Sequence, residues 1–178
     1  MPDKLNSIST IDGRYSKEAS ILSHYFSEYA LMKYRVMVEV EYIISLSKEK
    51  KLAGLPLIDN NTQRLLRKFY QNFDSISARR IKKIETQTNH DVKAVEIFVT
   101  EKLKKMNKSS LIPWVHFGLT SEDVNNLSYT IMWRDGIKNV YLDKLYALIK
   151  SIRAMATKYS KDAILSLTHG QPATPSTF

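Results

Sequence analysis

The chain has 178 residues, of which 43% are hydrophobic and 25% are charged, so it is long and apolar enough to bury a core and does not have the composition of a disordered protein. It contains no cysteine, which excludes disulfides and thiolate metal sites. The 27 basic and 18 acidic residues give a net charge of +9, which favours an anionic partner: a nucleic acid, a phosphorylated metabolite or an acidic protein surface.

The first residues of the chain have no apolar signal core, and no apolar run is long enough to span a membrane. We therefore expect a cytoplasmic protein without membrane contact. Residues 1–14 read as irregular, with a turn at Asp12-Gly13. A short helix is expected from Ser16 to Ser23.

Apolar residues at helical spacing predict further helices in the first two thirds of the chain. The low content of glycine and proline, five of each, also favours helices. These helices are expected at residues 28–51, 60–73, 75–86 and 91–106, with N-caps at Ser27, at Asn60 or Asn61, at Ser75 and at Asp91.

A long helix is expected from Ser121 to Tyr159, since apolar residues recur there at steps of three and four, apart from a weak stretch near Gly136. Glu122 and Asp123 complement the positive end of its dipole. At about 1.5 Å per residue the helix would be roughly 58 Å long. So small a chain cannot bury the apolar stripe of such a rod, which therefore requires partner helices from further sequence or from other subunits.

The expected fold class is all-α, with no segment that predicts a sheet. A compact N-terminal helical domain is expected at residues 1–110, followed at 111–178 by the first long helix of a central helical bundle. Gly170 and the two prolines after it predict an irregular loop, which would hold His169 at a fixed position beyond the long helix.

Polar side chains gather at four points where a predicted helix begins or ends. Helix N-termini bind anions, and imidazole is the side chain best suited to proton transfer near neutral pH. Each group also has a structural explanation, because Asn, Asp, Ser and Thr are ordinary helix caps and a lone Arg usually pairs with a surface acid. The four groups are Arg14 with Tyr15; Asn89 with His90 and Asp91; Thr120 with Ser121; and His169.

Other site classes find little support in the sequence. It has no dinucleotide fingerprint, phosphate loop or nucleophile elbow. We expect no metal site, since His90 and Asp91 lack a second ligand at helical spacing. His24 and His116 are expected to be structural. The basic clusters lie near predicted helix ends without alternating aromatics, which favours solvated termini over a nucleic-acid surface.

Four motifs, spread in order over nearly the whole chain, resemble those of the adenylosuccinate lyase family, in its bacterial form. Residues 168–177 (THGQPATPST) are similar to the catalytic-histidine segment, and residues 120–128 (TSEDVNNLS) to a second signature block. Residues 88–96 (TNHDVKAVE) and 12–15 (DGRY) resemble two further motifs. Related lyases that act on fumarate or argininosuccinate share the Thr-His-x-Gln core, but they do not typically share the Gly-Gln-Pro-Ala-Thr-Pro segment or the Asn-His-Asp block.

The resemblance implies a homotetramer of mostly helical, three-domain subunits, whose long central helices form one bundle. It implies β-elimination of fumarate from a purine nucleotide or its imidazole precursor, with no redox cofactor and no metal. The site residues it implies are His169 as the acid that protonates the departing nitrogen, Arg14 and Tyr15 at the phosphate, and Asn89, His90, Asp91, Thr120 and Ser121 as further substrate ligands.

Members of the family continue well beyond the length of this chain, and the Gly-Ser-Ser-x-Met-Pro loop that carries their general base is not found in residues 1–178. We therefore expect the chain to be the N-terminal part of such an enzyme and to be inactive alone. The alternative is a helical domain that assembles or binds without chemistry. A basic nucleic-acid binder is a third interpretation, which steeply salt-dependent binding would support.

Overall fold

The computed structural model describes residues 4–49, 52 and 54–177. They form two compact units, which divide between Gly136 and Ile137. Both units are built mainly of helices, which confirms the expected all-α class, although the second also contains one two-stranded sheet. The proposed domain boundary near residue 110 stays a prediction.

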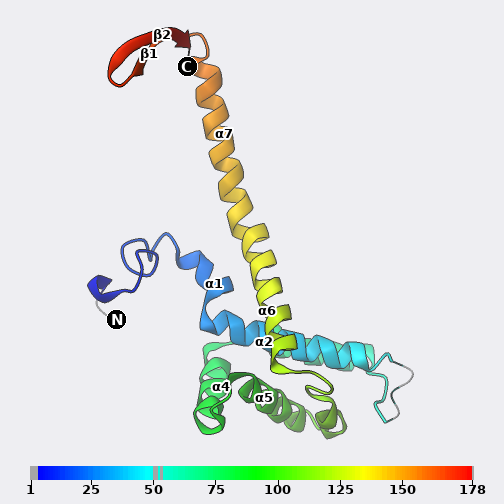
Figure 1. The fold of residues 1–178 in the computed structure, drawn as a ribbon. Coiled ribbons are helices and arrows are strands. Elements are labelled where there is room, and N and C mark those ends of the chain that lie inside the picture. The colour runs from blue at the N-terminus through cyan, green and yellow to red at the C-terminus, as the bar shows by residue number, and fades with distance from the viewer. Residues whose placement is uncertain (1–3, 50–51, 53, 178) are drawn as a thin grey trace. The chain divides into compact units, whose positions relative to one another are not determined.

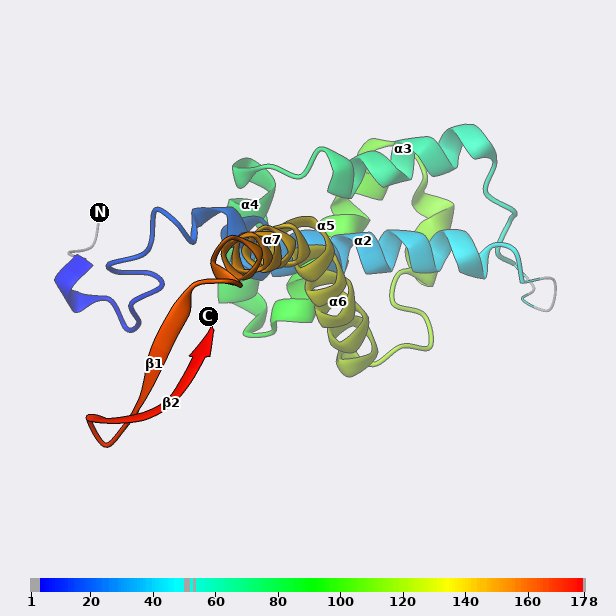
Figure 2. The same ribbon diagram turned by 90° about the horizontal axis from the view of Figure 1, so that it is seen from above.

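The first unit is arranged around the long helix α2, which packs against α3, α5 and α6. Figure 2 shows α3 running beside α2 in the opposite direction, and Figure 1 shows α4 and α5 as a neighbouring pair. The α-helices are α1 (Ser23–Phe26), α2 (Glu28–Leu46), α3 (Asn60–Gln71), α4 (Ser75–Thr88), α5 (Asp91–Lys105) and α6 (Ser121–Gly136), with 3₁₀ turns at Lys4–Asn6, Ser20–Leu22 and Ser109–Trp114.

The predicted caps of three helices lie one residue away from the observed ones. Ser27 caps α2 as expected, because its hydroxyl accepts the Ala30 N–H at 3.1 Å. Helices α3, α4 and α5 are instead capped by Asp59, Asp74 and His90. Each of these residues keeps an extended backbone and accepts N–H groups two or three residues further on, which leaves the residues expected as caps inside the helix.

Two predicted helix lengths are also wrong. Residues 16–19 form turns rather than helix, so the short helix is only the 3₁₀ turn Ser20–Leu22 followed by α1. Helix α2 ends at Leu46, where the expected helix continued to Lys51. The described residues 47–49 form a turn and a coil position, and Lys50 and Lys51 lie outside the described residues.

The hydrophobic core of the first unit is formed by α2 to α5 and the turn after α5. Its fully buried members include Val36, Ile43, Leu66, Ile81 and Leu103. Two smaller clusters join α2 to α6, one around Met132 and one around Val124. Aliphatic side chains on one face of each helix therefore position the polar residues at the helix ends.

We predict that Ile43→Val lowers the free energy of unfolding by about 0.5–1.5 kcal/mol, because it removes one methylene from a fully packed site. Ile43 is 1% exposed. The matched control is Ile76→Val in α4, at a side chain that is 70% exposed. Urea unfolding followed by circular dichroism measures both. A loss no larger at Ile43 than at Ile76 would contradict the assigned core.

The second unit contains a π-helical segment (Ile137–Tyr141), α7 (Leu142–Tyr159) and the strands β1 (Ala163–Thr168) and β2 (Gln171–Thr177). The residues from Ser121 to Tyr159 are thus helical throughout, as expected. A π-helical segment begins directly after Gly136, where the periodicity is weak. Helix α7 has no buried residue, and its exposed apolar side chains include Leu148, Ile152 and Met155.

The prediction of an irregular loop around His169 is wrong, because β1 and β2 pair there as an antiparallel hairpin. His169 and Gly170 form its two-residue turn, with φ angles of 51° and 77°, and tight hairpin turns of type I′ require positive φ at both positions. Pro172 and Pro175 are tolerated because β2 is an edge strand, where a missing N–H costs no ladder bond on its open side.

Candidate functional site

The junction between α4 and α5 is a tight turn that exposes an imidazole. Asn89 ends α4 in the left-handed conformation, with φ 50°. His90 then caps α5 through Nδ1, which accepts the Lys93 backbone N–H at 3.1 Å. Because Nδ1 accepts, neutral His90 carries its proton on Nε2, at the edge of the ring that does not contact its own helix.

The start of α6 is closed by the side chain of Asp123, which accepts two hydrogen bonds from Thr120. The backbone N–H of Thr120 donates to Asp123 Oδ2 at 2.7 Å, and the Thr120 hydroxyl donates to the same oxygen at 2.8 Å. The first of these bonds is the half of a capping box in which the acidic side chain accepts the N-cap backbone N–H, here with Asp in the acidic position. These two hydrogen bonds hold the pKa of the Asp123 carboxyl below its usual range, so Asp123 stays charged and Thr120 is held in one orientation.

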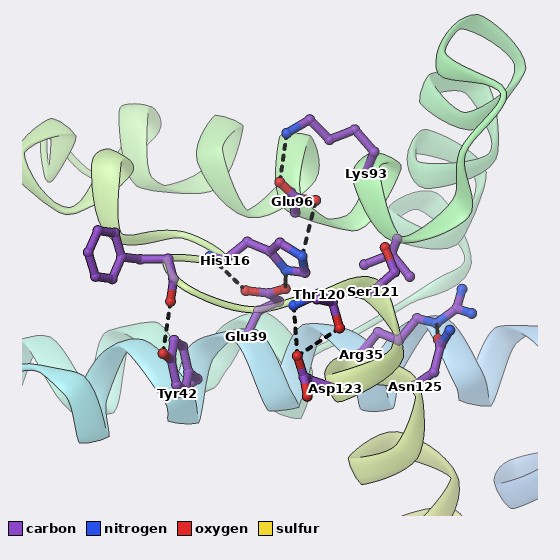
Figure 3. Close-up of polar contacts among 12 residues, drawn as sticks. Arg35, Glu39, Tyr42, Lys93, Glu96, His116, Thr120, Ser121, Asp123 and Asn125 are labelled. Carbon is purple, nitrogen blue, oxygen red and sulfur yellow. Dashed lines mark hydrogen bonds and ion pairs between the residues drawn. The ribbon is translucent and has the colours of Figure 1, made fainter.

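The N-termini of α5 and α6 meet at His90 and Ser121. The Ser121 hydroxyl lies 3.4 Å from His90 Nε2, and both side chains are accessible to solvent (Figure 3 labels Ser121). Val92 and Val124 are fully buried just behind them, in one cluster with Val38. Two helix N-termini at one spot concentrate free N–H groups and positive dipole ends, which favours an anionic ligand.

Arg35 of α2 connects the two junctions through Asp91 and Asn125, although no local sequence pattern indicates this role. Its guanidinium forms an ion pair with Asp91 Oδ2 at 2.6 Å and donates from Nε to Asn125 Oδ1 at 3.0 Å. The Arg35 side chain is only 5% exposed. Partial burial opposes ionisation of Asp91, but the Val92 N–H and Arg35 outweigh it and lower the pKa of Asp91.

A second buried pair, Glu39 with His116, lies beside this site (Figure 3). His116 Nδ1 lies 2.6 Å from Glu39 Oε1, and the His116 backbone N–H donates to Glu39 Oε2 at 3.1 Å. Glu39 is fully buried, and His116 has the left-handed φ of 59°. On the other side of the ring, Glu96 Oε1 lies 3.8 Å from Nε2, and Lys93 pairs with Glu96 at 2.8 Å.

The expectation that His116 is structural stays a prediction, and the structure places its ring between two glutamates at the edge of the site. An apolar loop, Trp114 to Leu119, surrounds His116 in the sequence, and nothing local indicates the glutamate on α2. After folding, its positive φ and its bonds to Glu39 distinguish His116.

The buried carboxyl of Glu39 should make the free energy of unfolding depend on pH in an unusual direction. Burial raises the pKa of Glu39 above 4.5, although its bonds to His116 oppose the shift. The folded protein then holds this proton more tightly than the unfolded chain does, so the free energy of unfolding falls as the pH rises through the interval above 4.5. Carboxyls with a lowered pKa, such as Asp91 and Glu101, have the opposite effect. They make the free energy of unfolding rise with pH, at pH values below their usual pKa.

We expect Glu39→Gln to remove this decrease in the free energy of unfolding. The stability of the variant should therefore change less with pH above 4.5 than that of the parent. Glu122→Gln, at an exposed position in α6, is the control and should follow the parent curve. Urea midpoints measured at pH values from 4 to 8 give the comparison. Parallel curves for Glu39→Gln and the parent would contradict the raised pKa.

The structure thus brings together five of the eight candidate residues, namely Asn89, His90, Asp91, Thr120 and Ser121. Arg14 and Tyr15 lie in the N-terminal segment, where the guanidinium carbon of Arg14 lies 5.7 Å from the centre of the Tyr15 ring. Both are exposed. His169 is exposed at the hairpin turn of the other unit.

Neither a metal cluster nor a membrane span is found in the part of the chain that the structure describes. No group of three or more His, Asp or Glu side chains there is arranged to hold a metal ion. Among the same residues, no helix combines the length and apolar character needed to cross a bilayer.

Comparison with known proteins yields one family and a consistent set of relatives. The adenylosuccinate lyase of Legionella pneumophila (strain Corby) is 42% identical over 174 residues, which cover 97% of this chain and 38% of the relative. That of Dictyostelium discoideum is 42% identical over 179 residues, covering 98% and 38%. That of Escherichia coli (strain K12) is 41% identical over 174 residues, covering 97% and 38%.

The chain therefore spans about two fifths of the length of the curated relatives it matches. The protein family described as Lyase matches residues 13–178, which include all four polar groups identified in the sequence. Since this match extends over nearly the whole chain, the chain belongs to the lyase family.

Proposed function

We propose that the chain is part of an adenylosuccinate lyase, which releases fumarate from adenylosuccinate to give AMP and from succinyl-aminoimidazole carboxamide ribotide to give AICAR. The observation that carries the proposal is the meeting of His90 and Ser121 at two helix N-termini, in a chain whose relatives bear this name. Both substrates are polyanions, which suits that site and the net charge of +9.

The reaction is a β-elimination. A base removes a proton from the carbon beside a carboxylate, the carbon–nitrogen bond breaks, and an acid protonates the departing nitrogen because an amine anion is a poor leaving group. Negative charge builds up on the carboxylate during proton removal, and fixed donors stabilise it. We assign the acid to His169 by the resemblance of residues 168–177 to the catalytic-histidine segment.

The remaining roles follow from the chemistry of each junction. His90 Nε2–H and the Ser121 hydroxyl are donors to substrate oxygens, and Thr120 is fixed beside them by Asp123. Asp91 lies at the same site with its charge balanced by Arg35, so it repels an anionic substrate less than a free carboxylate would. Asn89 presents an amide from the left-handed turn.

Arg14 and Tyr15 are assigned to the substrate phosphate, since a guanidinium and a phenol are both donors to phosphate oxygens. Their side chains are exposed and make contact with each other. This exposure leaves the guanidinium donors accessible to a ligand.

We further propose that the working enzyme is a cytoplasmic homotetramer and that residues 1–178 alone do not turn over substrate. Helix α7 supports the assembly, because its apolar residues recur at helical spacing and are exposed. The absence of a Gly-Ser-Ser segment from residues 1–178 supports the inactivity, since that loop carries the general base in the family. A non-catalytic helical assembly domain is the alternative that the same face of α7 favours.

The test is a joined protein, in which residues 1–178 replace the matching part of the Legionella relative and the rest of that enzyme follows. We expect it to release fumarate from adenylosuccinate, measured by the absorbance change of the purine. A folded, tetrameric joined protein without activity would contradict the proposed function. The 178-residue chain is assayed alongside, and appreciable fumarate release from it would contradict the proposed inactivity.

A titration separates the remaining interpretations. We expect the 178-residue chain to bind AMP more tightly than duplex DNA of the same phosphate concentration, measured by calorimetry at two salt concentrations. Tight, steeply salt-dependent binding to generic DNA would instead favour a nucleic-acid binder.

A further inference from the structure

An open pocket of about 500 Å³ lies between α3 and the C-terminal end of α5, within the first unit. Its volume is in the range of sites for small organic ligands, about 300–1,000 Å³. Helix α5 has 15 residues, so its ends are roughly 21 Å apart at about 1.5 Å per residue. The candidate site lies at the N-terminal end of α5 and this pocket at the other, so the two are separate.

The pocket has an apolar floor and a basic rim. Leu65, Phe69 and Met106 provide the floor, and Phe69 is a member of the main core cluster, so its position is fixed by packing. The other lining residues are Lys68, Asn72, Lys102 and Lys108, and no acidic residue is among them.

Within the described residues the three lysines form no ion pair, in contrast to Lys82 and Lys93 of the same unit. Lys82 and Lys93 each form ion pairs with glutamates at 2.7 to 2.9 Å. Among the residues that the structure describes, no carboxylate lies within ion-pair distance of Lys68, Lys102 or Lys108.

Lys102 and Lys108 are moreover half-buried, and the Lys102 ammonium lies 5.2 Å from the centre of the Phe98 ring. Like charges gathered around one hollow repel each other, and an anion bound between them relieves that repulsion. Lys102 also lines a smaller neighbouring pocket of about 210 Å³, in which Arg80 is paired with Glu101.

We propose that this pocket binds a small organic anion: a phosphate group, held by Lys68, Lys102 and Lys108, on a flat apolar body that covers Phe69 and Met106. Asn72 supplies an amide to the polar edge of the ligand. An inorganic ion uses only the rim and a neutral aromatic uses only the floor, so each binds more weakly than a molecule that combines both.

The test uses 1-naphthyl phosphate as the probe, with inorganic phosphate and 1-naphthol as its two halves. Binding to the 178-residue chain is followed by calorimetry and by chemical shifts of ¹³C-labelled methionine methyl groups, which include Met106. We expect the combined probe to bind at least about tenfold more tightly than either half, and the Met106 signal to move.

The variant Lys68→Gln, Lys102→Gln, Lys108→Gln should weaken binding of the probe by at least about tenfold. The matched control, Lys138→Gln, Lys144→Gln, Lys150→Gln, has the same net charge and changes three exposed lysines of the second unit. It should bind as the parent does. Equal weakening in both variants, an unmoved Met106 signal, or no binding of the probe at millimolar concentration would overturn the proposal.

Discussion

His169→Ala in the joined protein is expected to lower kcat by about 10²–10⁴-fold, the usual contribution of a general acid. Without the imidazole, the departing nitrogen must leave as an anion or wait for water to protonate it. Because this proton transfer takes place only in the transition state, kcat and kcat/KM should fall together while KM changes little. Steady-state kinetics with adenylosuccinate measures both constants.

The control for His169→Ala is His24→Ala, which removes an exposed histidine of α1 that has no role in the proposed mechanism. It should retain the parent rate. His169 is exposed at a hairpin turn, so its loss should leave the unfolding midpoint unchanged and the rate effect is not a folding effect. Near-normal turnover by His169→Ala would exclude His169 as the acid.

Arg35→Ala is expected to lower the free energy of unfolding of the 178-residue chain by about 3 kcal/mol, the lower end for breaking a buried ion pair. The lower end applies because Asp91 is 49% exposed and water can solvate it once Arg35 is gone. Asn125 loses its donor at the same time, and the missing side chain leaves a void beneath both helix N-termini.

Arg134→Ala is the matched control, because Arg134 is 64% exposed and, within the described residues, forms its one ion pair with its neighbour Asp135. Exposed pairs of this kind contribute about 0–1 kcal/mol. Urea unfolding of both variants gives the comparison. Arg35→Met fills much of the same space without the charge, so the difference between Arg35→Ala and Arg35→Met measures the part of the loss that comes from the void. An Arg35→Ala variant as stable as Arg134→Ala would contradict the proposed buried bridge.

The positions of the helices in this chain follow from local sequence patterns, but the residue at which a helix begins depends on which side chain hydrogen-bonds to its first N–H groups. The apolar spacing along α2, α5 and α6 predicts each helix, because the burial of one face is repeated every turn. The residue that caps a helix is decided by which side chain reaches a free N–H. Asp59 and Asp74 precede the residues expected as caps, and the sequence alone does not distinguish these neighbouring polar side chains.

The hairpin at the end of the described chain shows a limit of treating proline as a breaker. Pro172 and Pro175 prevent a central strand but not an edge strand, and whether a strand lies at an edge is a property of the sheet. Ile164, Leu165 and Leu167 of β1 alternate poorly with polar residues, so their local pattern does not favour a half-buried strand.

The order of the four motifs and the helical periodicity were enough to predict the lyase family and the helical class, because both depend on residues close together in sequence. The buried polar groups required the folded chain. Arg35 and Glu39 lie four residues apart on α2, and their partners Asp91 and His116 come 56 and 77 residues later. Only packing of α2 against α5 and α6 makes those pairs, since desolvation forces each buried charge to find a partner that no local spacing encodes.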